Sequence, residues 1–215
     1  MDPAEFDAML NEMGQAAEWR PSYDCPCRAE YSGAADPDCP VCNGKGVTWG
    51  DAVTGTVAVA GQKVQQAWAK LGMYEQGDMV LTLPTDSPVF AMGQFDRVTM
   101  MDSTVPFSRV LTHTGGERLQ VRVSGITRVF WRAAGDIVVG ALPTVGSDGA
   151  LAWPAPDPDD PDAPGEPPEG VQYSITGRRH PEYFALKEFP QDRAHFGGTL
   201  FPRRVALREM DLFSR

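Results

Sequence analysis

The chemistry in this chain is concentrated in four cysteines that lie within eighteen residues, a spacing typical of metal ligands. They form two close pairs, Cys25-Pro26-Cys27 and Cys39-Pro40-Val41-Cys42, and the rest of the 215-residue chain contains none. Zinc bound by four thiolates has Zn–S bonds of about 2.3 Å, which places its sulfurs about 3.7 Å apart. Two pairs joined by a loop can supply that geometry. The sequence therefore predicts a zinc site with Cys25, Cys27, Cys39 and Cys42 as ligands.

The second pair is the more specific half of this pattern. It reads C-P-x-C-x-G-x-G, typical of a zinc knuckle, because Gly44 and Gly46 let the backbone turn through positive φ and aim amide N–H groups at the sulfurs. The first pair is C-x-C instead of C-x-x-C, so Cys25 and Cys27 must reach the metal from an extended, proline-stiffened segment. Two disulfides or four unrelated buried thiols are the alternatives.

The apolar runs and the net charge of the chain bear on the choice between a metal site and disulfides. The acidic start has no apolar run long enough for a signal peptide, and no stretch approaches the roughly 18 apolar residues of a membrane helix. We therefore expect synthesis in a reducing cytoplasm, where clustered cysteines favour metal over disulfides. The net charge of −10 and pI near 4.7 argue against a nucleic-acid ligand.

Much of the negative charge lies in one proline-rich insertion, residues 154–169. It contains six acidic residues and no basic one: Asp157, Asp159, Asp160, Asp162, Glu166 and Glu169, interleaved with prolines. Such a segment cannot bury apolar surface, so we expect it to be extended or mobile. A solvated loop is the simplest interpretation, and a docking arm for a basic neighbour is the alternative.

Near the N-terminus the sequence predicts a short helix. Asp2-Pro3-Ala4-Glu5 offers an N-cap, a proline at the first helical position and a capping-box acid. An apolar stripe of Phe6, Met9, Leu10 and Met13 follows, and we expect it to pack on its own domain or, alternatively, to dock on a neighbouring subunit.

Most of the remaining chain alternates apolar and polar residues with the period of β-strands. We expect strands at 53–60, 79–83, 89–95, 97–101, 109–113, 118–123, 127–132, 137–142 and 170–176, and a helical turn or two at 62–71. Short strands at this spacing predict a mainly β fold, an antiparallel barrel or sandwich. The predicted domains are a helical arm at 1–20, a four-cysteine zinc module at 21–50 and a β-domain at 51–215, with 154–169 as a long hairpin insertion.

Basic residues concentrate toward the C-terminus. Arg178, Arg179, Arg203 and Arg204 stand out. A solvated strand face is the simplest interpretation, and the alternatives are contact with an acidic partner or with nucleic-acid phosphates.

Enzyme motifs are missing from the sequence: it has no G-x-S-x-G elbow, dinucleotide fingerprint, P-loop or H-E-x-x-H pair. Four thiolates also close a tetrahedral zinc site, leaving no position for an activated water. We therefore expect no catalytic residues and a structural metal. A metalloenzyme would need an open metal site.

Three stretches resemble structural proteins of tailed bacteriophages that are encoded among head and neck genes. They are the knuckle at 39–46; the segment 76–84 with Ser87-Pro88 and Phe95-Asp96-Arg97-Val98; and Glu188-Phe189-Pro190-Gln191-Asp192-Arg193 with Gly197-Gly198 and Pro202-Arg203-Arg204-Val205. The resemblance implies a stopper- or collar-type component of the head-to-tail connector, a β-barrel with arms that assembles as a ring.

That resemblance sets the functional expectations. The chain is expected to be a virion neck protein, made in the host bacterial cytoplasm, that forms a hexameric or dodecameric ring between portal or adaptor and tail proteins. Packaged DNA would be a passive neighbour, and no membrane is involved. Phe6, Leu10, Arg178, Arg179, Arg203 and Arg204 are the candidate interface or DNA-channel residues. The alternative function is a zinc-ribbon nucleic-acid-binding protein.

Overall fold

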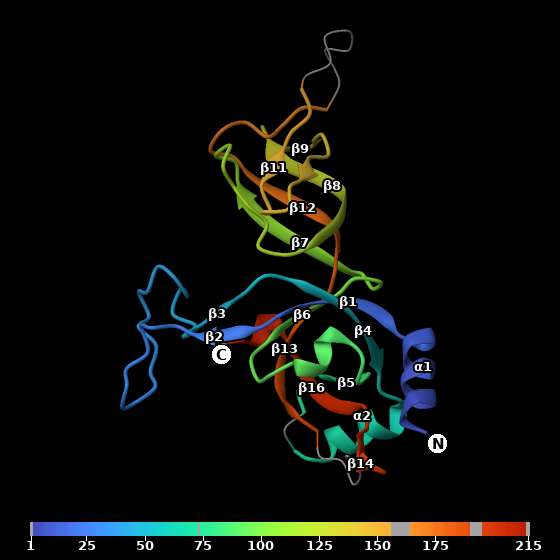
Figure 1. Cartoon of the computed structure of the whole chain (residues 1–215). Helices are drawn as coiled ribbons and strands as arrows, with labels where there is room; N and C mark the ends of the chain where they lie inside the picture. Colours follow the sequence, from blue (N-terminus) through green and yellow to red (C-terminus); the bar gives the residue numbers. More distant parts are fainter. Residues whose placement is uncertain (1, 73, 156–163, 190–194, 214–215) are drawn as a thin grey trace. The chain divides into compact units, whose positions relative to one another are not determined.

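The computed structural model describes residues 2–72, 74–155, 164–189 and 195–213, and the chain forms two compact units (Figure 1). The first unit combines Met1–Asp102 with Glu182–Arg215, and the second is Ser103–Pro181. The second unit is thus inserted into the chain of the first. The domain limits drawn from sequence did not separate residues 103–181, which form a hydrophobic core of their own.

The first unit is a closed six-stranded antiparallel barrel, which confirms the predicted fold class. Its strand order is β1-β4-β5-β16-β13-β6. The strands are β1 (Gln15–Arg20), β4 (Val53–Val59), β5 (Met79–Leu83), β16 (Arg203–Glu209), β13 (Glu182–Glu188) and β6 (Arg97–Met100). Fully buried side chains from these strands, among them Val57, Leu81, Val98 and Leu207, fill its interior.

Helix α1 (Pro3–Met13) forms as the sequence predicts. The Asp2 side chain accepts a hydrogen bond from the Ala4 amide, and Glu5 completes the capping box. The helix packs against β4 (Figure 1). The expected second helix is α2 (Gln62–Ala69), whose Trp68 is fully buried. Two short 3₁₀ helices, η1 (Pro88–Ala91) and η2 (Met210–Leu212), complete the helical elements of the described residues.

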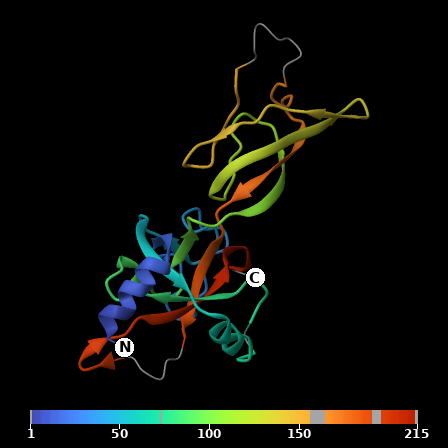
Figure 2. The same ribbon diagram turned by 90° about the vertical axis from the view of Figure 1, so that its right-hand side faces the viewer.

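The second unit has two layers. A four-stranded antiparallel sheet runs in the order β7 (Val105–Thr112), β12 (Gln172–Arg179), β8 (Val123–Ala133) and β9 (Asp136–Val139). Figures 1 and 2 show β8 alongside β12 over most of its length. The hairpin β10 (Thr144–Val145) and β11 (Leu151–Ala152) belongs to the other layer. Between the layers, Val129, Trp131, Tyr173 and Ile175 form the core.

Two further ladders lie in the first unit. Strands β2 (Ser22–Asp24) and β3 (Val47–Trp49) pair at the base of the cysteine segment, and β14 (His195–Phe196) pairs with β15 (Thr199–Leu200).

Several strand predictions were wrong in detail. The expected helical arm at 1–20 ends in barrel strand β1, and the expected strand at 89–95 overlaps the 3₁₀ helix η1. At 118–123 the structure has an isolated bridge from Arg118 to Ala150 before β8 begins at Val123. Pro88 fixes a φ angle suited to a helical first turn, and its preceding Ser87 is extended.

The hairpin interpretation of the acidic insertion was also wrong. The strands expected on either side of it, at 137–142 and 170–176, correspond to β9 and β12, which are not neighbours because β8 lies between them. The strand that directly precedes the insertion is β11, which pairs with β10 in a separate sheet. Asp157, Asp159, Asp160 and Asp162 fall outside the described residues, whereas Glu166 and Glu169 lie within them.

Candidate metal centre

The cysteine segment leaves the barrel between β1 and β4, and the β2–β3 ladder closes its base. Ser22 pairs with Trp49, and Asp24 with Val47, in this antiparallel ladder. The Trp49 indole N–H donates to the Phe95 carbonyl (2.9 Å), which ties the ladder to the barrel wall. The ladder thus brings the two cysteine pairs together from opposite ends of the segment.

All four cysteine sulfurs converge within 4.8 Å of one another. Cys25 Sγ lies 3.8 Å from Cys39 Sγ, and Cys27 Sγ lies 3.5 Å from Cys42 Sγ. These separations are far longer than the roughly 2.05 Å of a disulfide and close to the roughly 3.7 Å expected around one tetrahedral metal. All four cysteines are free, so the structure has no disulfide here. The predicted ligand set therefore fits a single metal ion.

The knuckle residues have the backbone conformation that their types predict. Asn43, Gly44 and Gly46 have φ values of 51°, 77° and 73°. This turn aims the Gly46 amide at Cys42 Sγ (3.3 Å), and the Gly46 carbonyl accepts from the Cys25 amide (2.8 Å). One glycine therefore contacts both halves of the cluster, which is how the short C-x-C pair is brought into register with the knuckle.

The thiols differ in acidity. Burial raises the pKa of the Cys42 thiol, but the Gly46 amide and the neighbouring cysteines outweigh this effect and lower the pKa to about 7. For Cys27 a backbone hydrogen bond favours the thiolate, but burial and the other three sulfurs outweigh this effect and raise the pKa of the thiol to about 12. Adjacent thiols cannot all ionise without a cation, since each thiolate disfavours the next. A divalent metal would supply that charge.

Three of the four cysteines are buried, and Cys27 is partly buried. A tetrahedral ion held by all four thiolates has no open position for water or substrate. A metal bound in this way would hold the segment together and would leave no coordination position for a substrate. The stabilising effect of the metal would be local, because the hydrophobic cluster that the structure describes in this segment consists of the four cysteines themselves.

The basic interface candidates lie in different units. Arg178 and Arg179 belong to β12 in the second unit, whereas Arg203 and Arg204 belong to β16 in the barrel. The Arg178 guanidinium donates to the Thr104 hydroxyl and carbonyl, both at 2.7 Å. The arginines that are concentrated toward the C-terminus in the sequence therefore belong to two different units of the fold.

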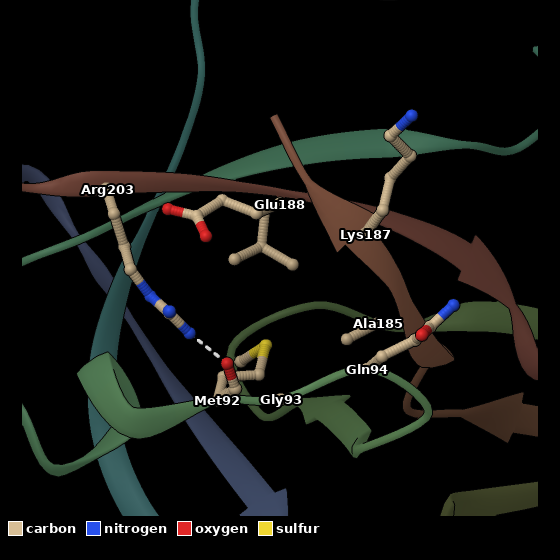
Figure 3. A pocket seen from close by; sticks show the side chains of 8 residues that line it. Met92, Gly93, Gln94, Ala185, Lys187, Glu188 and Arg203 are labelled. Atoms are coloured by element: carbon tan, nitrogen blue, oxygen red, sulfur yellow. Dashed lines mark hydrogen bonds between the residues drawn. The ribbon is translucent and has the colours of Figure 1, made fainter. Parts of the chain in front are cut away.

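Arg203 lies at a pocket of about 260 Å³ in the barrel unit, shown in Figure 3. Its guanidinium donates to the Met92 carbonyl and lies over the Phe90 ring, with 5.4 Å to the ring centroid. Lys187 and Glu188 also line the pocket. Arg203 is thus engaged within its own unit.

The apolar candidates of α1 are mostly covered. Leu10 is buried and Phe6 is partly buried, whereas Met13 is 76% exposed. Asp7, on the same helix, accepts hydrogen bonds from the Thr85 amide (2.9 Å) and hydroxyl. The helix therefore packs on its own unit, the simpler of the two interpretations of its stripe.

Sequence reasoning missed a buried polar cluster in the second unit. His113 Nδ1 lies 2.7 Å from Glu117 Oε1, and the Tyr173 hydroxyl donates to the same oxygen (2.9 Å). Burial would raise the pKa of Glu117, but hydrogen bonds, first among them that from His113, lower it to about 2. The i, i+4 spacing of His113 and Glu117 was the available signal, and Tyr173 is too distant in sequence to have been linked to them.

No family model matches the chain, and no curated protein matches it. Among the described residues, the structure also contains no helix long and apolar enough to cross a membrane.

Proposed function

We propose that this chain is a non-enzymatic virion structural protein that forms a ring in the neck of a tailed bacteriophage. The ring joins the portal and capsid to the tail and surrounds the DNA channel. The proposal combines the motif resemblance of three sequence stretches with the architecture of the chain.

The closed barrel is the observation that carries the proposal. Closure leaves the six barrel strands without a free edge, so copies of this unit cannot grow into a continuous sheet. Contacts between copies then fall to the elements outside the barrel: helix α1, the cysteine segment and the inserted second unit. A closed barrel with several separate contact elements suits a ring subunit, which needs two different faces for its neighbours.

The cysteine cluster suits this role as a structural zinc site. Zinc is the metal that four thiolates in tetrahedral arrangement favour. Bound there, it would order a segment too small for its own core, as structural zinc does at an apparent binding free energy of about 10–16 kcal/mol. In the ring this would keep the segment stiff enough to contact a neighbour.

Assembly is the direct test. Native mass spectrometry and negative-stain electron microscopy of the purified protein, alone and with portal and tail proteins, should reveal rings of six or twelve copies. A protein that stays strictly monomeric and binds neither component would overturn the proposal. Steeply salt-dependent DNA binding by the isolated chain would instead favour the zinc-ribbon nucleic-acid function.

The metal has a separate test. Elemental analysis of the purified protein should find one zinc per chain, and Cys39→Ser or Cys42→Ser should release it and increase amide exchange across residues 23–49. Val41→Ser is the matched control, because Val41 lies in the same knuckle but is exposed and supplies no ligand. A wild-type chain that folds fully and keeps this segment ordered without metal would contradict the structural role.

A further inference from the structure

The second unit leaves one face of its main sheet uncovered. Side chains on the inner face, such as Val129, Tyr173 and Ile175, are buried against the other layer. Within the second unit, no described residues form a layer over the outer face. Because side chains alternate along a strand, every second residue of β7, β12, β8 and β9 points outward.

Cross-strand register collects apolar side chains into one row on this outer face. Val110 of β7 pairs with Ser174 of β12, Ser174 with Phe130 of β8, and Phe130 with Val139 of β9. Val110 is 66% exposed and Val139 is 53% exposed, and Ile137 beside them is 61% exposed. The row therefore spans the whole sheet, with Ser174 as its one polar member, and groups apolar side chains that ordinary monomers scatter singly over their surface.

Positive charge surrounds this row. Arg128, Arg132 and Arg178 occupy outward positions on β8 and β12, and the Arg128 guanidinium lies 4.8 Å from the centroid of the Phe130 ring. No aspartate or glutamate occupies the outward positions that these four strands pair in register. A purely cationic face stands out in a chain with a net charge of −10.

Positive and negative charges of the second unit are concentrated in different parts of its sequence. Outside the acidic insertion, residues 103–181 contain seven arginines but only three acidic residues, Glu117, Asp136 and Asp148. The insertion at 154–169 contains six acidic residues and no basic one. One chain thus carries both a cationic, partly apolar face and a segment of opposite charge.

We propose that the outer face of the β7-β12-β8-β9 sheet of one copy binds the acidic proline-rich segment, residues 154–169, of a second copy. The contact presupposes the ring of copies proposed above. Proline-rich chains lose little conformational entropy on binding and pair well with exposed aromatic surfaces. Carboxylates of the segment would face Arg128 and Arg132, and proline rings would cover Phe130 and Val110.

Two observations favour a second copy over the segment of the same chain. Trp153, directly before the segment, packs into the core on the inner side of the sheet. Toward the end of the segment, the Gly165 carbonyl accepts from the Ala141 amide (2.8 Å), and Glu166 Oε2 lies 3.8 Å from His113 Nε2. The segment thus leaves and re-enters the unit at the inner layer, whereas the proposed binding face is the outer one.

The apolar row also favours a peptide over a nucleic acid. Phosphates would satisfy the arginines, but single-stranded nucleic acid binds chiefly by stacking bases on aromatic rings, and this face offers one such ring among aliphatic side chains. A segment with alternating carboxylates and proline rings matches both features.

A labelled peptide of residues 153–170 tests the contact directly. Fluorescence anisotropy should show that it binds the full chain, with affinity falling as salt rises, while a peptide with all six acids changed to their amides does not bind. Arg128→Gln with Arg132→Gln should weaken binding roughly five- to tenfold, because the variant loses two exposed ion pairs, each of which contributes only modestly. Arg118→Gln, an exposed arginine outside the sheet, is the matched control and should leave binding unchanged.

Equal binding of the acidic and amide peptides would overturn the proposal. So would tighter binding of an oligo-dT of the same length that is lost in the same arginine variants, which would make the face a nucleic-acid surface. Electron microscopy separates this contact from the neck assignment. Rings that form without peptide binding would overturn only the contact, whereas peptide binding by a chain that never forms rings would overturn only the neck function.

Discussion

Replacement of Asp96 is the sharpest test of how the metal segment is attached to the barrel. This buried carboxylate accepts hydrogen bonds from the Trp19 indole N–H (2.7 Å), the Ser22 amide (2.7 Å) and hydroxyl (2.9 Å), and the Gly93 amide (2.7 Å). Trp19 lies near the end of the barrel strand β1, and Ser22 begins β2 at the base of the cysteine segment. One side chain therefore links the barrel to the ladder that carries the cysteines.

The expected cost follows from these bonds. Hydrogen bonds to a charged group contribute about 1.5–3 kcal/mol each, and a buried donor left without a partner costs about 1–3 kcal/mol. Asp96→Asn keeps the shape but presents an NH₂ group to N–H donors, so at least one buried donor loses its acceptor. Because neighbouring effects are not additive, we expect a loss of about 3 kcal/mol for Asp96→Asn and about 5 kcal/mol for Asp96→Ala.

The assay combines global and local readouts. Urea unfolding followed by tryptophan fluorescence should show the lower free energy of unfolding, and the Asn variant should melt about 10 °C lower. Hydrogen exchange should rise across residues 22–49 before it rises in the barrel core. Asp102→Asn is the matched control, because exposed Asp102 accepts a bond from the Ala16 amide (2.7 Å). If Asp96→Asn costs no more than this control, the linking role of Asp96 is refuted.

Two other perturbations test single features of the structure. Glu117→Gln should remove a contribution to the free energy of unfolding that depends on pH. The folded-state pKa of Glu117 is about 2, below the ordinary 4.5. The carboxylate therefore stabilises the fold fully above about pH 4.5 and loses this effect as the pH falls toward 2. The gap in unfolding free energy between the two proteins should therefore close between pH 5 and pH 2, and a gap that stays constant would contradict the role of Glu117. Gly46→Ala should weaken zinc binding about tenfold, because φ is 73° there and an added Cβ would lie 3.0 Å from the Ala35 Cβ. Gly61→Ala is its control, since φ is −62° at Gly61 and nothing lies within 4 Å; equal zinc affinity in the two variants would count against this account.

Local signals in the sequence predicted local structure well. The N-cap at Asp2 and the capping box with Glu5 depend on residues three positions apart, and the helix forms with both contacts. The knuckle glycines likewise depend only on backbone freedom within a few residues, and Gly44 and Gly46 adopt the positive φ angles expected of them. The convergence of the four cysteines followed because metal-ligand chemistry restricts how such residues are spaced.

Features set by long-range pairing could not be predicted in the same way. Strand β1 was assigned to a helical arm, because its role depends on pairing with β4 and β6, which lie far along the chain. The acidic insertion looked like a hairpin because strands are predicted on either side of it, at 137–142 and 170–176, yet β8 separates the corresponding β9 and β12 in the sheet. The cationic outer face also depends on long-range pairing and could not be predicted, since only the strand register places Phe130 beside Ser174 and Val139.

Buried aspartates recur where additional elements meet the barrel. Asp7 joins α1 to Thr85, Asp78 accepts from the Trp68 indole of α2 (3.2 Å) and from Arg208 of β16 (2.9 Å), and Asp96 joins β1 to the cysteine segment. A buried carboxylate is costly unless every donor around it is in place, so each of these aspartates favours one position of its element over all others. The barrel thus holds α1, α2 and the cysteine segment through directional polar contacts while its own apolar core stays closed. Substitutions on the outer surfaces of those elements can then alter which neighbour is bound without disturbing the barrel, and that is where we expect the binding specificity of this protein to reside.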